Sequence, residues 1–187
     1  MIPVTIRKIV EIKAPIERVW RYVGTEEGLR QWWGVNLSLE TKQGGRCAER
    51  SLFNGKPLYL TGEVTVYDPP HQLSLLLRRA DAADTWPIFT YISLQLKETQ
   101  GNTVVTLEHQ ALGSLPEEYT SGLPMPQVQT PTPERQVILN QLPSASTAAV
   151  TLLASSTSQT SERTWVRTYE SRWESAFEQL QQMVLHS

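Results

Sequence analysis

The chain has 187 residues and a formal net charge of −2, which excludes the basic excess that recruits nucleic acid or anionic membranes. Its length fits one domain with a sizeable buried core. The single cysteine, Cys47, excludes an intrachain disulfide and fits a reducing compartment. The N-terminus lacks the apolar run of a signal peptide, and the weakly polar run at residues 146–154 is too short to cross a bilayer. The composition therefore predicts a soluble, cytoplasmic protein.

The first thirty-four residues predict a strand followed by two helices. Residues 4–13 alternate apolar and polar side chains, which is typical of a strand. Thr25 can cap the second helix, which ends near Gly34. The first helix follows Pro15 and has apolar residues spaced along one face: Ile16, Val19, Trp20 and Val23.

Two adjacent tryptophans, Trp32 and Trp33, stand at the end of the second predicted helix. Neighbouring helical residues point about 100° apart, so both rings cannot enter one narrow core in the same direction. We expect one ring to anchor the helix and the other to close a cavity or face its mouth. The alternative is that both rings are simply packed, as aromatic pairs at helix ends usually are.

Residues 44–112 change to the two-residue period of strands, with turns at residues 54–56, 68–70 and 100–102. Alternation on one side only indicates an antiparallel sheet of about six or seven strands with one covered face. The residues expected on that covered face are Val64, Val66, Leu73, Leu75, Leu77, Ile92, Leu94, Leu96, Val105, Leu107 and His109.

Residues 113–163 break this pattern, because six of the twelve prolines lie here among many serines and threonines. We interpret the segment as a Pro/Ser/Thr-rich insertion in a single domain spanning residues 1–187, extended or irregular, in which residues 133–142 could form a short helix. An ordered flap and a solvated linker both remain open.

The last segment, from Glu162 to about Leu185, predicts a long helix that covers the sheet. At about 1.5 Å per residue it exceeds roughly 30 Å. Bulky rings would hold it away from a curved sheet, leaving a gap that side chains fill or that forms a pocket. Its apolar face comprises Trp165, Tyr169, Trp173, Phe177, Leu180 and Val184. The fold class is therefore α+β.

Residues 4–112 and 164–186 resemble the activator of heat-shock protein 90 ATPase-like family of the START-like (Bet v 1-like, SRPBCC, polyketide cyclase-like) superfamily. The resembling stretches are "VEIKAPIERVWRYV", "EEGLRQWWG", "GGRC", "NGKPLYLTGEVTVYDPPHQL", "LQLKETQGNTVVTLEHQAL" and "YESRWESAFEQLQQMV". The resemblance implies a helix-grip fold, in which a curved antiparallel sheet wraps around a long C-terminal helix and an internal cavity, with two short helices after the first strand. The insertion at 113–163 departs from the family. We do not expect the client-docking domain of the co-chaperone, so co-chaperone activity does not follow.

Catalytic and metal-binding residues are not predicted. The three histidines, His71, His109 and His186, are too scattered for a recognised metal spacing. A lone cysteine on a strand, such as Cys47, is usually a small buried hydrophobe. There is no Gly-rich phosphate loop, so we expect no cofactor.

Polar residues that interrupt apolar strand faces are the candidates for a binding site. His109 shares a face with Val105 and Leu107, and Glu49 lies on the side of Cys47. In an enclosed pocket either could hold the polar end of a ligand or move a proton. The alternatives are half-exposed positions near strand ends and, for the aromatic residues, ordinary core packing. The predicted ligand-binding residues are Trp33, Glu49, Tyr59, Trp86, Phe89, His109, Tyr169 and Trp173.

The leading functional hypothesis is a protein that binds a small apolar or amphipathic ligand in an internal cavity without covalent chemistry. One alternative is a polyketide cyclase or aromatase-like enzyme using His109, Glu49 or Tyr59 as acid or base. Another is a protein-interaction or co-chaperone-like role through residues 113–163. We expect neither nucleic acid nor membrane as partner, and a monomer or weak homodimer.

Overall fold

The computed structural model describes residues 4–34, 36–53, 55–80, 87, 89–112 and 147–186, except the side chains of Phe53, Lys56 and residues 147–161. Met1–Ser114 and Glu162–Ser187 form one compact unit, and Leu115–Ser161 form a second. The predicted helix at 133–142 and the candidate Trp86 lie outside the described residues. For residues 113–146 the predicted insertion therefore stays a prediction.

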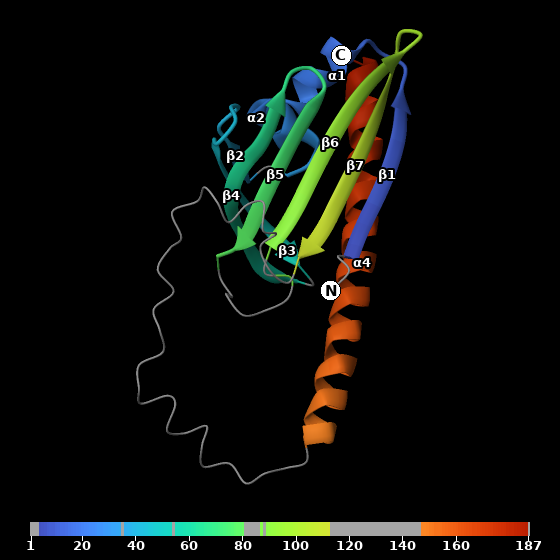
Figure 1. Ribbon diagram of the computed structural model, residues 1–187. Helices are drawn as coiled ribbons and strands as arrows, with labels where there is room; N and C mark the ends of the chain where they lie inside the picture. The colour runs from blue at the N-terminus through green and yellow to red at the C-terminus, as the bar shows by residue number, and fades with distance from the viewer. Residues whose placement is uncertain are drawn as a thin grey trace. The chain divides into compact units, whose positions relative to one another are not determined.

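Seven antiparallel strands form one curved sheet in the order β1-β7-β6-β5-β4-β3-β2 (Figure 1). The first strand, β1, pairs with the last strand, β7, although the two lie at opposite ends of the 4–112 segment. The predicted α+β fold with six or seven antiparallel strands is confirmed. The strands are β1 (Val4–Ile12), β2 (Leu37–Leu39), β3 (Arg46–Phe53), β4 (Lys56–Asp68), β5 (Gln72–Arg79), β6 (Phe89–Thr99) and β7 (Asn102–Leu112).

The inner face of the sheet carries the core. Of the eleven residues predicted for this face, all but Val66 are buried. The register of β4 against β5 shifts between Val64 and Val66, because a β-bulge interrupts the ladder there. This irregularity explains why strict alternation places Val66 wrongly.

Two short helices, α1 (Ile16–Val23) and α2 (Glu26–Trp32), follow β1 as predicted. The Thr25 side chain accepts a hydrogen bond from the Gly28 backbone N–H at 3.0 Å, which caps α2. A Cβ atom at Gly28 would lie 2.5 Å from the Cα atom of Tyr22, so glycine lets the two helices approach. The four apolar residues predicted for one face of α1 are all buried.

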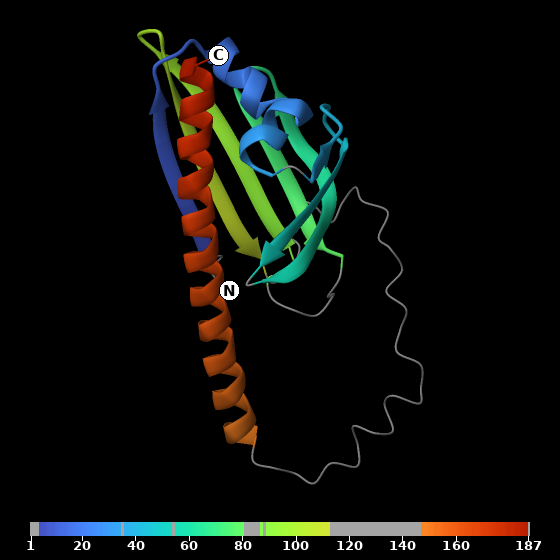
Figure 2. The ribbon, with the colours of Figure 1, turned by 180° about the vertical axis from the view of Figure 1, so that it is seen from behind.

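The long helix α4 (Thr147–His186) begins earlier than the predicted start at Glu162. Residues 147–161 contain Ala and Leu, which favour helices, and neither Gly nor Pro to stop one. Their many Ser and Thr residues led us to expect an irregular segment, and that expectation was wrong. Within the first compact unit, residues 162–186 lie along the same face of the sheet as α1 and α2 (Figure 2).

The inner side of residues 162–186 is buried against the sheet, as the helical spacing predicted. It comprises Trp165, Tyr169, Trp173, Ala176, Phe177, Leu180 and Val184. Among the residues that the structure describes, no helix combines the length and apolar character needed to span a bilayer.

Candidate functional site

The paired tryptophans at the end of α2 are both buried, Trp32 at 3% and Trp33 at 5% exposure. The indole N–H of Trp32 donates to the Tyr22 carbonyl oxygen at 2.9 Å, which anchors α2 on α1. The Trp33 ring lies edge-on to the ring of Trp173 in α4, with centroids 4.9 Å apart. Both rings are therefore packed, and Trp32 is the ring that anchors the helix, as expected for one of the two.

Glu49 is a buried carboxylate between the sheet and α4. It lies on β3 opposite two buried leucines, Leu37 and Leu60, and is 2% exposed. Its Oε1 atom accepts a hydrogen bond from Arg172 Nη2, and its Oε2 atom accepts one from Trp33 Nε1 at 3.3 Å. Because a buried carboxylate is costly unless it is paired, this ion pair ties α4 to β3 at one defined position.

Two further groups near Glu49 keep their protons. Burial, followed by the charge of Glu49, raises the pKa of the Cys47 thiol to about 12. Burial is also the main cause that raises the pKa of the Tyr169 hydroxyl. The Cys47 side chain is buried, as predicted. Its thiol stays protonated, whereas a nucleophilic cysteine needs a thiolate.

His109 is enclosed by aromatic rings of α4. It lies on the inner face of β7 and is 1% exposed. Its ring centroid lies 4.7 Å from those of Trp165 and Tyr169 and 5.8 Å from that of Trp173. The Trp173 indole N–H donates to His109 Nδ1 at 3.0 Å. A polar ring thus sits in an otherwise aromatic environment.

The protonation state of His109 follows from this environment. Burial, followed by the positive charge of Arg172, lowers the pKa of His109 to about 3, so the ring is neutral near pH 7. An indole N–H can only donate, so Nδ1 must accept and the single ring proton sits on Nε2. Nε2 is buried and has no hydrogen-bond partner within the described part of the chain.

The structure brings five of the eight predicted site residues together where α4 packs on the inner face of the sheet. They are Trp33, Glu49, His109, Tyr169 and Trp173, linked by the ring contacts and hydrogen bonds given above. The alternative in which Glu49 and His109 are half exposed was wrong, because the inner face of the sheet is covered by α4 at both positions.

Tyr59 and Phe89 do not join this group. Tyr59 is 41% exposed, and the Arg50 guanidinium lies 5.7 Å from its ring centroid. Its neighbours Leu58 and Leu60 are buried, so alternation turns Tyr59 to the outer face. Phe89 is half-buried at the start of β6. Both were wrongly expected on the inner face.

Arg172 is the member of the group that sequence reasoning missed. Its spacing could have revealed it, since Tyr169, Arg172, Trp173 and Ala176 follow the i, i+3, i+4, i+7 pattern of one helix face. An arginine on that face needs a buried acid opposite, and Glu49 is that acid.

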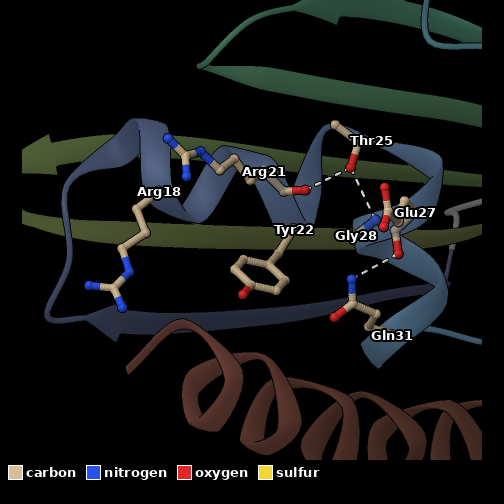
Figure 3. A pocket seen from close by; sticks show the side chains of 7 residues that line it. All are labelled: Arg18, Arg21, Tyr22, Thr25, Glu27, Gly28 and Gln31. Carbon is tan, nitrogen blue, oxygen red and sulfur yellow. Dashed lines mark hydrogen bonds between the residues drawn. The ribbon is translucent and has the colours of Figure 1, made fainter. Parts of the chain in front are cut away.

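No group of three or more histidine, cysteine, aspartate or glutamate side chains that could hold a metal occurs among the residues described. A separate depression of about 500 Å³ lies at the surface of α1 and α2 (Figure 3). Two of its polar side chains bond within the helices: Thr25 Oγ1 donates to the Arg21 carbonyl, and Gln31 Nε2 donates to the Glu27 carbonyl. The lining residues are Arg18, Arg21, Tyr22, Thr25, Glu27, Gly28 and Gln31.

The family model described as activator of Hsp90 ATPase homolog 1-like protein matches residues 13–142, more than half of the chain. The match includes α1, α2 and strands β2 to β7 and ends before α4. No curated relative matches the chain.

Protein MLL2253 and protein Ms6760 share the fold at low sequence identity, and CalU16 is a weaker match. Protein MLL2253 from Mesorhizobium loti aligns with a TM-score of 0.60 and 17% identity over 98% of both chains. Protein Ms6760 from Mycobacterium smegmatis aligns with a TM-score of 0.59 and 17% identity over 96% of this chain and 90% of its own. CalU16 from Micromonospora echinospora aligns with a TM-score of 0.45 and 18% identity over 62% of this chain. The aligned part spans 63% of CalU16.

Proposed function

The chain belongs to the family of activator of Hsp90 ATPase homolog 1-like proteins, and from that premise we propose that it binds a small hydrophobic or amphipathic ligand between the inner face of the sheet and α4. The observation that carries the proposal is the buried His109, a polar ring in an aromatic enclosure with one nitrogen left unpaired. Binding sites for small molecules are mostly apolar with a few convergent polar groups, and this group has that composition. One chain contains the whole site, so a monomer or weak homodimer suffices.

Two features of the site favour binding over acid–base catalysis. A general base works best when its pKa lies near the operating pH, whereas the pKa of His109 is about 3. Both carboxylate oxygens of Glu49 already accept hydrogen bonds, from Arg172 and Trp33. The third candidate, Tyr59, lies on the outer face. A cyclase-like or aromatase-like reaction is therefore the weaker proposal.

The protein-interaction or co-chaperone-like role rests on residues 113–163 and on the name of the family. Of that segment the structure describes the helical backbone of 147–161 and residues 162 and 163. This role predicts that deleting residues 115–145 abolishes binding of a partner protein such as Hsp90. The ligand-binding role predicts that the same deletion leaves ligand affinity intact.

The test is a titration with the uncharged fluorescent probe N-phenyl-1-naphthylamine. We expect saturable fluorescence enhancement that the Ala111→Leu variant abolishes, because Ala111 is 1% exposed on the inner face next to the His109 strand position. The matched control is Ala80→Leu, the same change at an exposed position, which should leave the titration unchanged.

Overpacking at Ala111 can cost about 1–3 kcal/mol of stability, so a second filling variant is needed. Ala176→Leu adds the same volume from the α4 side of the enclosure, where Ala176 is 5% exposed. Loss of probe binding in a folded variant at either position supports the proposal. A wild-type protein that does not bind the probe, or equal binding in all variants, contradicts it.

A further inference from the structure

The unpaired nitrogen of His109 has a defined chemical character. Trp173 occupies Nδ1 with an N–H donor at 3.0 Å, so the proton of the neutral ring sits on Nε2. The orphaned atom is therefore an N–H donor that lacks an acceptor. The hydrogen bond from Trp173 fixes this tautomer, and the rings of Trp165 and Tyr169 contact the His109 ring.

A second orphaned group lies beside it on the neighbouring strand. In the β6–β7 ladder, Ile92 pairs with His109 and Thr90 pairs with Ala111, so Thr90 and His109 are diagonal neighbours on the same face. Thr90 is 3% exposed, and its Oγ1 atom also has no hydrogen-bond partner among the described residues. A hydroxyl can donate or accept.

Two unsatisfied polar groups side by side are unusual in a folded interior. Most buried polar atoms have a partner, and each exception calls for a specific explanation. Here the two exceptions are diagonal neighbours on the inner face of the sheet, and aromatic rings surround one of them, His109. A single partner atom within hydrogen-bond distance of both would satisfy them together.

The chemistry of the two groups restricts that partner. His109 Nε2–H requires an acceptor, and the Thr90 hydroxyl can donate to the same atom, which points to an oxygen with two lone pairs. A carboxylate would bring a charge that needs a cation, and Arg172 is already paired with Glu49. The aromatic rings around His109 suit an apolar body.

Building on the function proposed above, we propose that the ligand is an apolar molecule with an uncharged carbonyl oxygen, which accepts hydrogen bonds from His109 Nε2 and Thr90 Oγ1. The recognition needs no change in the protonation of either residue. It selects against the hydrocarbon of the same shape, because the two donors would then stay unpaired.

The test compares ligands of one shape as competitors of N-phenyl-1-naphthylamine. The panel is 2-acetylnaphthalene, with the carbonyl, 2-isopropenylnaphthalene, in which a methylene replaces the oxygen, and 2-naphthoate, which carries a charge. We expect the ketone to displace the probe at a concentration about tenfold below that of the alkene, the effect of two modest hydrogen bonds. We expect 2-naphthoate to be the weakest competitor.

Variants then assign the preference to the two side chains. Thr90→Val removes the hydroxyl at nearly constant shape and should reduce the ketone preference, and His109→Phe should remove most of it. His109→Gln keeps an N–H donor and an acceptor and should retain part of it. Tyr59→Phe, which removes a hydroxyl on the outer face, is the control and should change nothing.

Different failures have different meanings. If the probe binds but ketone and alkene compete equally, the carbonyl proposal is overturned while ligand binding itself stands. If 2-naphthoate is the strongest competitor, the uncharged class is wrong. If the probe does not bind to the wild-type protein at all, both proposals fall. Should His109→Phe not fold, Thr90→Val decides alone.

Discussion

Two groups of buried polar side chains lie on opposite faces of the same sheet, and they differ in how their hydrogen bonds are completed. On the outer face, Ser74 and Ser93 pair across β5 and β6 with their Oγ atoms 3.0 Å apart, and Gln72 Nε2 donates to Ser74 Oγ at 3.0 Å. On the inner face, His109 Nε2 and Thr90 Oγ1 have no partner within the described residues.

This contrast is the basis of the proposed ligand-binding function. The outer serines satisfy one another, and such closed pairs cost little. The inner groups are equally buried but leave their bonding capacity unused. The region around them is stabilised by the Glu49–Arg172 ion pair and by the aromatic packing of α4.

The largest expected effect on stability comes from breaking the Glu49–Arg172 ion pair, which joins α4 to β3. Glu49→Gln leaves the Arg172 charge without its partner and should lower the free energy of unfolding by about 3 kcal/mol, measured in urea. This is the lower end for a buried pair, because the Arg172 side chain keeps 23% exposure.

The control for that variant is a pair at the surface. Glu174 pairs with Lys8 Nζ at 2.8 Å, but its side chain is 67% exposed, so Glu174→Gln should change stability by less than about 1 kcal/mol. Equal effects of the two variants would show that Glu49 is not held as described.

The next effect concerns the pH dependence of stability through His109. Between pH 6.5 and 3 the unfolded chain binds a proton at this residue and the native chain does not, so stability falls as the pH falls. From pH 7 to pH 5 this amounts to a loss of about 2 kcal/mol. Urea unfolding at several pH values should show a steeper acid loss in the wild-type protein than in His109→Gln. Parallel curves would mean that His109 takes up its proton in the native state.

The smallest effects test the contrast between the two faces directly. Ser93→Ala breaks a satisfied hydroxyl pair and should cost about 1 kcal/mol. Thr90→Val removes a hydroxyl without a partner and should cost nothing, or stabilise the ligand-free protein slightly. Thermal and urea unfolding of the two variants compare them. A loss in Thr90→Val as large as in Ser93→Ala would show that Thr90 is satisfied after all.

Periodicity predicted the fold and part of the site. Alternation along β7 placed His109 on the inner face, and the helical spacing after Glu162 placed Tyr169 and Trp173 on the helix face that covers the sheet. Alternation could also have excluded Tyr59 from the predicted binding site, since its neighbours Leu58 and Leu60 both point to the inner face.

Other features depend on contacts that no local pattern encodes. The bond from Trp173 to His109 and the pair of Arg172 with Glu49 join residues far apart in the chain, and only the register of the whole sheet under α4 brings them together. From the sequence we missed the early start of α4 at Thr147. Ser and Thr are weak helix formers, and we gave their abundance in residues 147–161 more weight than the absence of Gly and Pro there.

The most direct measurement is nitrogen NMR of the His109 ring in protein labelled with ¹⁵N-histidine, with and without 2-acetylnaphthalene. We predict a neutral ring protonated at Nε2 from pH 5 to pH 8, and an Nε2–H resonance that shifts with the ketone but not with 2-isopropenylnaphthalene. A proton on Nδ1, or a resonance indifferent to the ketone at saturating concentration, would contradict it.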